Sequence, residues 1–327
     1  MTRMHQIVFP ERGRAVCVER PTDASPLSPD ELAGPTCASV ISPGTELGMQ
    51  FDAADGFPHH PGYGAVFTAT RLGATVDDIT PGTRLFCIGP HASQQRCRRD
   101  AVVPIPPGLD ATTAVLVRLL GIAWARLSLS AVRPPAPVLI TGLGPVGHLA
   151  ARLAALWTHP VLAVDPDTQR RGLLAGHPGI ECAAAVPVDD PAWQDRPALA
   201  LECSGSEAAL HDCCRLVRRG SEVVVCGVPW RSRGERTLRD VMWKVFWRHL
   251  VLRGGWEWEL PWLPDPSFPT CYRDNIAAGL AWLASGRIDL TGLAATVAPQ
   301  DCQALYDDLT AGRTQHLYHV YNWSASD

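Results

Sequence analysis

Val138-Leu139-Ile140-Thr141-Gly142-Leu143-Gly144-Pro145-Val146-Gly147 is the stretch of sequence that decides the fold. Its first four residues are apolar or β-branched and predict a short buried strand. Its glycines have the spacing Gly-x-Gly-x-x-Gly, and an apolar-faced helix is expected to follow over Val146–Trp157. Gly142 permits a tight turn, Gly144 lets the backbone approach a pyrophosphate, and Gly147 lets the helix pack closely on the strand. Three glycines alone are weak evidence, but with a strand before them and a helix N-terminus after them they predict a dinucleotide site.

A second strand is predicted over Val161–Asp165, and its last residue is acidic. Asp165 follows the glycines at about the 20-residue offset where a carboxylate accepts hydrogen bonds from the ribose hydroxyls of NAD. The same charge repels a 2′-phosphate, so NAD is the expected cofactor. Arg170 and Arg171 lie about one helical turn further on and would weaken this preference, which leaves NADP as the alternative. Four more residues complete the expected cofactor site: Pro145, Val146, Ser204 and Gly227.

Strands and helices alternate after about residue 111, whereas the first third of the chain reads as short strands separated by Gly and Pro. The early strands are expected at Gln6–Phe9, Arg14–Glu19, Ala65–Arg71 and Thr83–Ile88, and the first long helix at Ala111–Ser128. Alternation predicts parallel βαβ units with helices on both faces of one sheet, a doubly wound α/β fold of the Rossmann type. The expected domains are a β-rich one over residues 1–112 and 290–327, and a dinucleotide-binding one over residues 113–289.

The composition is that of a compact two-domain protein, with 327 residues of which 46% are hydrophobic and 19% charged. A net charge of −4 provides no basic field for nucleic acid or anionic lipid. The expected partner is therefore a small-molecule substrate, with no nucleic acid and no membrane. No stretch approaches the roughly 18 uninterrupted apolar residues of a membrane span. Residues 1–10 lack the pattern of a secretory signal peptide, so the 11 cysteines are expected to be reduced thiols of a cytoplasmic protein.

Several phrases beyond the glycine motif resemble the medium-chain dehydrogenase/reductase superfamily over nearly the whole chain. They are Ser42-Pro43-Gly44-Thr45-Glu46, where that family has Cys-Gly-Thr-Asp; His60-Pro61-Gly62-Tyr63-Gly64, where it has Gly-His-Glu; Cys203-Ser204-Gly205; and Leu283-Ala284-Ser285-Gly286-Arg287-Ile288-Asp289. The resemblance implies a Rossmann sheet inserted into a GroES-like catalytic domain, a nicotinamide cofactor, and a homodimer or homotetramer.

The resemblance does not extend to the catalytic zinc ligands. The family's cysteine falls on Pro43, its histidine on Tyr63, its neighbouring glutamate on Gly64, and its last ligand in Arg118–Gly121, which has no cysteine. The stretch that corresponds to the structural zinc lobe holds only Cys87 and Cys97, with His91 between them. Tetrahedral zinc sites need thiolate and imidazole ligands that these positions lack, so a zinc-independent enzyme is expected.

Two further phrases resemble one branch of that superfamily: Gly89-Pro90-His91-Ala92-Ser93 and Gly254-Gly255-Trp256-Glu257-Trp258. The branch includes bacteriochlorophyllide dehydrogenases and the cyclitol or sugar dehydrogenases of natural-product pathways. The leading hypothesis is therefore reversible hydride transfer between nicotinamide and a secondary alcohol of a polyol, cyclitol or sugar-like intermediate. Two alternatives stay open: a zinc-free reductase of an activated C=C bond in an enone or quinone, and an NAD-binding protein without catalytic activity.

Without zinc, protein side chains must stabilise the developing alkoxide and carry its proton. Thr45 keeps the hydroxyl that, by resemblance, begins the proton relay of the zinc enzymes, and Tyr63 places a phenol at a lost ligand position. His59 and His60 precede it and would titrate near neutrality. Each candidate has a structural alternative: strand packing for Thr45, a core aromatic for Tyr63 and a solvated loop for the two histidines.

Five residues form the expected substrate pocket. Arg118 lies in an otherwise apolar predicted helix, where a charge needs a partner, either an acidic group of a ligand or a residue of the first domain. His91 either faces the substrate or caps a turn. Trp124, Trp256 and Trp258 would form an apolar wall for the C–H face of a sugar ring or for a planar macrocycle, or else pack between the domains.

Overall fold

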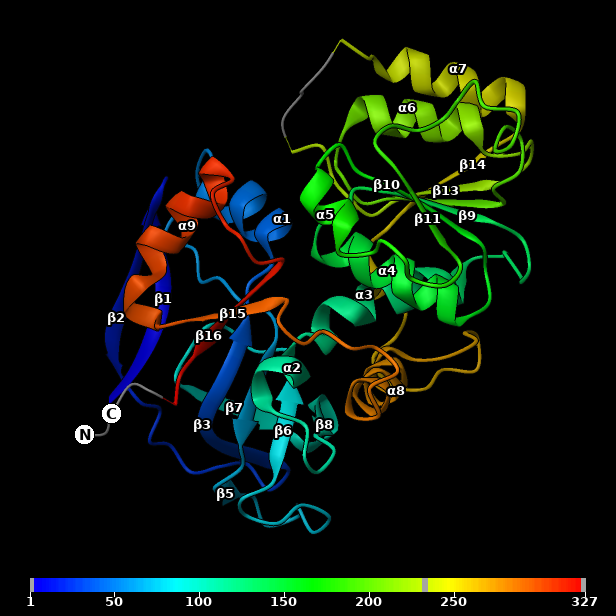
Figure 1. Ribbon diagram of the computed structural model, residues 1–327. Coiled ribbons are helices and arrows are strands. Elements are labelled where there is room, and N and C mark those ends of the chain that lie inside the picture. The colour runs from blue at the N-terminus through cyan, green and yellow to red at the C-terminus, as the bar shows by residue number, and fades with distance from the viewer. Residues whose placement is uncertain (1–2, 231–234, 325–327) are drawn as a thin grey trace. The chain divides into compact units, whose positions relative to one another are not determined.

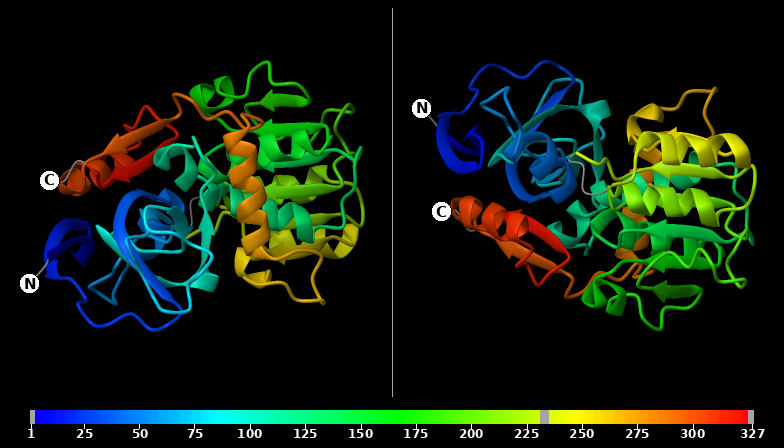
Figure 2. Two further views of the ribbon diagram at one scale, coloured as in Figure 1. Left: turned by 90° about the horizontal axis from the view of Figure 1, so that it is seen from below. Right: turned by 90° about the horizontal axis from the view of Figure 1, so that it is seen from above.

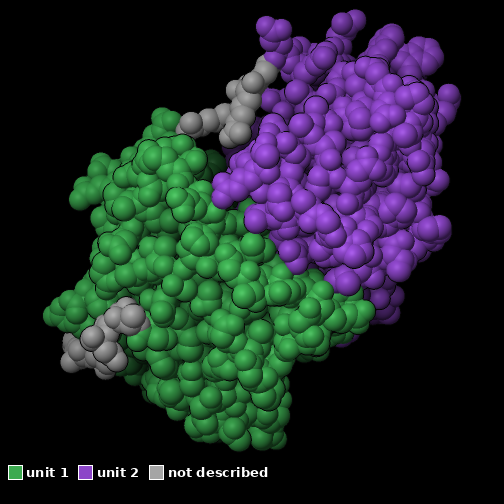
Figure 3. Space-filling view, viewed as in Figure 1, with its two compact units in different colours: residues 1–118, 273–327 green, residues 119–272 purple. Residues whose placement is uncertain are grey.

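The computed structural model describes residues 3–230 and 235–324, and these form two compact units (Figure 3). One unit holds residues 1–118 and 273–327, and the other holds residues 119–272. The second unit is therefore inserted into the first along the chain. The units divide inside the helices α3 (Val117–Leu129) and α8 (Tyr272–Ala284), whereas the sequence patterns placed the domain changes at residues 112 and 290.

The second unit is built on one parallel sheet of six strands in the order β11-β10-β9-β12-β13-β14. Its strands are β9 (Val138–Thr141), β10 (Val161–Val164), β11 (Ile180–Ala183), β12 (Leu199–Glu202), β13 (Glu222–Val225) and β14 (Val251–Gly254). β9, β10 and β12 are buried along their whole length, because helices cover both faces of a parallel sheet. The predicted Rossmann-type sheet is thereby confirmed.

Besides α3, which lies in this unit from Leu119 onward, the helices of this unit are α4 (Pro145–Leu156), α5 (Thr168–Gly172), α6 (Glu207–Leu216) and α7 (Leu238–Arg248). α6 and α7 lie side by side on one face of the sheet, and α4 lies on the other (Figures 1 and 2). The connection from β9 to β10 runs toward one edge of the sheet, and the connection from β12 to β13 runs toward the other. The carboxyl ends of β9 and β12 therefore form the switch point at which sheets of this kind bind ligands.

The first unit is organised around the long strand β3 (Glu31–Val40). Its main sheet has the order β15-β16-β3-β4-β6-β8, β5 and β7 also pair with β3, and β1 pairs with β2. The other strands are β1 (Arg3–Glu11), β2 (Arg14–Pro21), β4 (Ala65–Thr68), β5 (Arg71–Leu72), β6 (Arg84–Cys87), β7 (Gln94–Arg98), β8 (Val102–Pro104), β15 (Ala294–Val297) and β16 (Tyr318–Asn322). β16 pairs antiparallel with β3, so the C-terminal tail rejoins the first unit. The helix α9 (Cys302–Ala311) packs against β2.

The helix expected over Ala111–Ser128 is present as α2 (Ala111–Val115) followed by α3. Asp110 caps its start by accepting a hydrogen bond from the Thr113 backbone N–H at 2.9 Å. The stretch Ala111–Leu129 is long and apolar enough to cross a membrane, with a mean hydropathy of 1.4, yet 72% of its apolar window is buried inside the protein. Burial of this extent is typical of the core helix of a globular domain.

Several elements were not expected from the sequence, among them β3 and α7. β3 contains Gly34-Pro35, which argues against a strand. A Cβ on Gly34 would lie 1.8 Å from the Thr68 carbonyl oxygen, so glycine is needed where two strands approach closely. α7 has apolar residues on its exposed face as well as on its buried face. Its capping box of Thr237 and Asp240 was a usable signal.

Candidate active site

The glycine-rich loop joins β9 to α4 at the switch point of the sheet. Gly142 has a φ of +78°, and a Cβ on Gly147 would lie 1.8 Å from the Gly142 carbonyl oxygen, so the fold itself requires both glycines. A Cβ on Gly144 would meet no atom within 4 Å. Packing therefore does not explain Gly144, which faces open space in front of the helix.

The N-terminus of α4 has no side-chain cap. Its N-cap residue is Gly144 and its first residue is Pro145, whereas side chains of Asp167, Ser206 and Thr237 cap α5, α6 and α7. The backbone N–H groups of the first turn and the positive end of the helix dipole are thus left for an anion. The pyrophosphate of a dinucleotide fits this arrangement.

Asp165 lies beside the glycine-rich loop and is buried. Its Oδ2 accepts a hydrogen bond from the Leu143 backbone N–H at 2.7 Å, and its Oδ1 accepts one from the Asp167 N–H at 2.8 Å. The half-exposed Arg170 places a guanidinium nitrogen 3.6 Å from Oδ2, and Arg171 donates to the Asp165 carbonyl oxygen at 2.6 Å. The carboxylate is therefore held against the loop, and two cations flank it.

Glu202 ends β12 at the same edge of the sheet and was not predicted as a site residue. It is fully buried and accepts hydrogen bonds from the backbone N–H groups of Ser204 at 2.8 Å and Gly205 at 3.1 Å. Burial raises the pKa of the Glu202 carboxyl above its ordinary value. A Cβ on Gly227 would lie 2.4 Å from the Gly205 nitrogen. Glu202 therefore shapes the turn that brings the predicted residues Ser204 and Gly227 to this edge of the sheet. An acidic residue at the end of an apolar strand is the sequence signal that could have identified Glu202.

His91 lies at the centre of a buried polar cluster in the first unit. Its backbone N–H donates to the Pro61 carbonyl oxygen at 3.0 Å. Its ring lies 2.7 Å from Ser39 Oγ through Nδ1 and 3.3 Å from Glu46 Oε1 through Nε2. A Cβ on Gly62 would lie 2.7 Å from His91 Cγ, so this glycine makes room for the imidazole. The His91 ring therefore binds two side chains and does not cap a turn, and its contact with a substrate stays a prediction.

Glu46 is the second member of this cluster. Its Oε1 accepts a hydrogen bond from the Ser42 backbone N–H at 2.9 Å, and its Oε2 accepts one from the Tyr306 hydroxyl. Burial and the neighbouring Glu46 carboxylate raise the pKa of Tyr306 well above its ordinary value. At the other side of the His91 ring, Trp323 Nε1 donates a hydrogen bond to Ser39 Oγ at 2.9 Å. We call Ser39, Ser42, Glu46, His91 and Tyr306 the His91–Glu46 cluster.

Thr45 immediately precedes Glu46 in the short helix α1 (Pro43–Glu46) and is partly exposed. Ser42 Oγ donates a hydrogen bond to Thr45 Oγ1 at 3.4 Å. Since a hydroxyl has one hydrogen, Thr45 keeps its own for another acceptor. The predicted hydroxyl is thus presented by a helix that the His91–Glu46 cluster anchors.

Arg118 and Tyr63 form a pair within the first unit. The guanidinium carbon of Arg118 lies 4.0 Å from the centroid of the Tyr63 ring, and Arg118 Nε donates to the Tyr63 carbonyl oxygen at 3.0 Å. A Cβ on Gly64 would lie 2.8 Å from Arg118 Cγ, which explains the glycine at this position. The buried charge of Arg118 therefore has a protein partner, one of the two outcomes expected for it.

His59 and His60 lie on a loop that pairs with β1. His59 Nε2 lies 3.1 Å from the Asp55 carbonyl oxygen, and the His59 backbone pairs with Phe9. His60 is exposed, and partial burial together with the charges of Arg20 and His59 lowers its pKa. These contacts are those of a solvated loop, the alternative considered for this pair.

The three tryptophans of the expected pocket lie in different surroundings of the second unit. Trp124 is buried in α3, with its ring edge-on to Trp157 at 5.7 Å. Trp256 is 73% exposed, and Trp258 lies 5.2 Å from the Tyr272 ring. The three do not share one environment, and a wall for a sugar ring stays a prediction.

The residues at the expected zinc positions do not fit that ion. Pro43 is the first residue of α1 and offers no donor atom, and Tyr63 and Gly64 replace imidazole and carboxylate. Residues 3–230 and 235–324 contain no group of three or more His, Cys, Asp or Glu that could hold a metal ion. The thiols of Cys87 and Cys97 face each other, and this contact together with burial raises the pKa of Cys87 well above its ordinary value.

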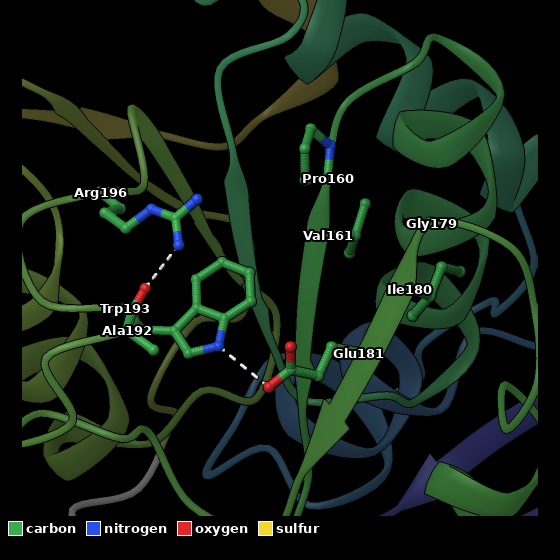
Figure 4. A pocket seen from close by; sticks show the side chains of 8 residues that line it. All are labelled: Pro160, Val161, Gly179, Ile180, Glu181, Ala192, Trp193 and Arg196. Atoms are coloured by element: carbon green, nitrogen blue, oxygen red, sulfur yellow. Dashed lines mark hydrogen bonds between the residues drawn. The ribbon is translucent and has the colours of Figure 1, made fainter.

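A hollow of about 430 Å³ on the second unit lies elsewhere (Figure 4). Val161, Ile180 and Trp193 are among the residues that line it, and Trp193 Nε1 donates to Glu181 Oε1 at 2.9 Å. Val161 and Ile180 begin β10 and β11, whereas the glycine-rich loop follows the carboxyl end of β9. The hollow is therefore at the opposite end of the sheet from the nucleotide site.

Comparisons with known proteins point to dehydrogenases, although no family model matches the chain. The chain is 29% identical over 147 residues to an alcohol dehydrogenase of Geobacillus stearothermophilus, a match that covers 43% of each protein. It is 24% identical over 206 residues to a 2-dehydro-3-deoxy-L-galactonate 5-dehydrogenase of Pseudoalteromonas atlantica, covering 60% of this chain and 53% of that protein. The chain thus matches about half the length of these curated relatives.

Solved structures resemble the chain over nearly its full length. Galactitol-1-phosphate dehydrogenase from Escherichia coli superposes with a TM-score of 0.80 at 14% identity, covering 97% of this chain and 99% of that one. Acetophenone reductase from Geotrichum candidum, solved in complex with NAD, superposes with a TM-score of 0.78 at 13% identity, covering 98% of both chains. At such identities the likeness shows the fold, a Rossmann sheet joined to a β-rich domain.

Proposed function

We propose that the chain is a nicotinamide-dependent dehydrogenase of a secondary alcohol, of the medium-chain dehydrogenase/reductase kind that its sequence phrases resemble and its dehydrogenase relatives support. The uncapped glycine-rich loop beside Asp165 carries this proposal, since it offers an anion site and a ribose acceptor at the switch point. A polyol or sugar-like substrate is supported by relatives named for a deoxygalactonate and for galactitol phosphate. Cyclitols and other natural-product intermediates are included because of the phrases at residues 89–93 and 254–258.

NAD is the proposed cofactor, and when bound its nicotinamide accepts the hydride from the carbinol carbon. The N-terminus of α4 would bind the pyrophosphate, and Asp165 would accept hydrogen bonds from the ribose. Asp165 is already fixed by the N–H groups of Leu143 and Asp167, so little reorganisation is needed. Arg170 lies 3.6 Å from the Asp165 carboxylate. Its positive charge would weaken the repulsion of a 2′-phosphate, so NADP is the second proposed cofactor.

Two hydroxyls of the first unit are assigned to the alcohol oxygen. Thr45 receives a hydrogen bond from Ser42, so it is set to donate its own hydrogen to the substrate oxygen. Tyr63 presents a phenol from a half-buried ring beneath the Arg118 guanidinium. Such donors stabilise the charge that develops on the oxygen as the hydride leaves. His59 and His60 stay predictions for the proton acceptor.

Zinc independence is part of the proposal, on the ground that Pro43, Tyr63 and Gly64 offer no zinc ligand set. The test is NADH formation from a panel of polyols, sugar acids and cyclitols by protein that has been treated with a metal chelator. Turnover that survives chelation is the expected result. Turnover that disappears on chelation and returns with added zinc would overturn it.

The same assay separates the two alternatives. Reduction of 2-alkenals or quinones by NADPH, with no oxidation of any saturated alcohol, would replace the proposal by a C=C reductase. Binding of NAD in a calorimetric titration, with no turnover in either panel, would replace it by a nucleotide-binding protein without catalysis.

The proposed protein partner is a second copy of the chain, in a homodimer or in a homotetramer. Seven large apolar side chains of α7 and the edge strand β14 are 36–75% exposed: Leu238, Met242, Trp243, Phe246, Trp247, Val251 and Leu252. At roughly 200 Å² for each fully exposed large side chain, they offer on the order of 800 Å², the area each partner gives to a stable interface. A two-fold axis beside β14 would pair this edge with itself.

Analytical ultracentrifugation tests this partner. Phe246→Glu is expected to yield monomers, because a buried unpaired charge disfavours the interface. Leu263→Glu, at an exposed apolar residue outside α7 and β14, is the matched control and should keep the wild-type mass. A wild-type monomer, or a Phe246→Glu variant of unchanged mass, would contradict the assignment.

A cytoplasmic location is also proposed. The 11 cysteines and the use of a nicotinamide cofactor favour a reducing compartment. Cell fractionation with an antibody to the chain tests this location, and recovery in the membrane or extracellular fraction would contradict it.

A further inference from the structure

We infer that Glu46 and His91 act as a buried positioning pair. The pair holds together the two segments that correspond to the cysteine and histidine zinc ligands of the resembled family, and it thereby fixes the position of Thr45. The catalytic consequence rests on the proposed function, whereas the pairing itself does not. Both side chains are almost completely buried in the first unit, and neither belongs to the nucleotide site.

Three segments that are distant in sequence meet at His91. Its backbone N–H binds the Pro61 carbonyl oxygen, and its ring lies against Gly62, next to Tyr63. Through Glu46 it reaches α1, which bears Pro43 and Thr45. The two positions where the resembled family places its cysteine and its histidine are thus joined by a protein side-chain pair.

Glu46 fixes α1 by a specific hydrogen bond. Its carboxylate accepts the Ser42 backbone N–H at 2.9 Å, at the residue before the helix begins, and this serine in turn donates to Thr45 Oγ1. Tyr306, from α9, donates to the other carboxylate oxygen. A shift of Glu46 would therefore move the start of α1 and the direction of the Thr45 hydroxyl.

The hydrogen-bond polarity of the pair is defined by its neighbours. An ionised carboxylate only accepts, so the His91 Nε2 that faces Glu46 carries a hydrogen. Ser39 Oγ accepts from Trp323 Nε1 and faces His91 Nδ1 at 2.7 Å, so every polar atom of the pair has a partner of the right kind. The rings of Tyr306 and Tyr321 are among the neighbours of the pair. An apolar pair beside them would avoid the cost of removing polar groups from water, which argues for a role beyond filling the core.

The test uses the full-length protein with His91→Gln, Glu46→Gln and the double variant. His91→Gln leaves the Glu46 carboxylate buried without its imidazole, so kcat is expected to fall on the order of 100-fold, the effect of misplacing a reacting group by about 1 Å. KM for NAD is expected to stay unchanged, because the cofactor binds to the second unit. The double variant has no carboxylate at position 46, so its kcat is expected to be at least about tenfold higher than that of His91→Gln.

A second readout does not depend on turnover. Hydrogen exchange of the Ser42 backbone amide, which is bound to Glu46, is expected to be at least about tenfold faster in His91→Gln than in the wild type. His159→Gln is the matched control, since it removes a buried imidazole with one hydrogen bond, to the Ala136 carbonyl oxygen at 2.8 Å, in the second unit. That variant should leave both kcat and the Ser42 exchange rate at their wild-type values.

Additive effects of the two single substitutions, or an unchanged Ser42 exchange rate in His91→Gln, would overturn the pairing. If the wild type oxidised no alcohol, the proposed function would fail, yet the exchange measurement would still decide whether His91 positions α1. Faster exchange with an unchanged kcat would show that the pair is structural and would overturn its catalytic consequence.

Discussion

Replacement of Gly144 by alanine separates the two reasons for glycine in the loop between β9 and α4. Gly144 has φ −65° and ψ −173°, a conformation open to any L-residue, and a Cβ there would meet no atom within 4 Å. The free energy of unfolding should therefore stay within about 1 kcal/mol of the wild type, the usual effect of Gly→Ala at a compatible position. The new methyl group would stand where the pyrophosphate approaches. The Kd for NAD is expected to rise at least about tenfold, which is roughly 1.4 kcal/mol.

Gly147→Ala is the matched control, because its Cβ would lie 1.8 Å from the Gly142 carbonyl oxygen. This overlap would push α4 away from β9, so the free energy of unfolding is expected to fall by roughly 1–3 kcal/mol because of overpacking. Calorimetric titration with NAD and denaturant unfolding of both variants give the two quantities. A Gly144→Ala protein that bound NAD as tightly as the wild type would refute the assignment of this loop to the pyrophosphate.

Three further outcomes follow from the same geometry. Asp165→Asn should weaken NAD binding and narrow its advantage over NADP, measured as the ratio of the two Kd values; an unaltered ratio would disprove the charge argument. Tyr63→Phe should lower kcat while leaving the Kd for NAD unchanged, and unchanged kinetics would remove the phenol from the mechanism. Burial raises the pKa of Glu202, so its stabilising contribution is complete below the pKa of an exposed glutamate and is lost as pH rises through the raised pKa. Glu202→Gln should abolish that loss in unfolding free energies measured across pH, and a profile identical to the wild type would contradict this reasoning.

The Rossmann sheet could be predicted because its signals are local. The apolar strand before Gly142, the glycine spacing and the apolar helix after it lie within twenty residues, and the structure has all three. Strand β3 and helix α7 could not be recognised in the same way. Gly34 serves a close approach to Thr68, a neighbour that only the folded sheet supplies. In α7 apolar residues occur on the exposed face as well as on the buried face, so the sequence does not show which of them face the core.

The candidate site shows the same limit. Thr45 and Tyr63 were found through phrases that can be read along the chain. Glu46 lay in one of those phrases, but its partner Tyr306 is 260 residues away and has no local signal. Arg118 was recognised as a charge in need of a partner, and only the structure identifies that partner as Tyr63. Side-chain pairs formed by distant segments depend on the register of the β-rich unit, which sequence periodicity does not define.

The central claim is that this chain transfers a hydride from a secondary alcohol to NAD without a metal. The most direct measurement uses a polyol that is deuterated at its carbinol carbons, with chelator-treated protein of known metal content and mass spectrometry of the nucleotide. The account predicts NADH that carries one deuterium at a rate unaffected by chelation. NADH without deuterium, or deuterium transfer that appears only after zinc is restored, would contradict it.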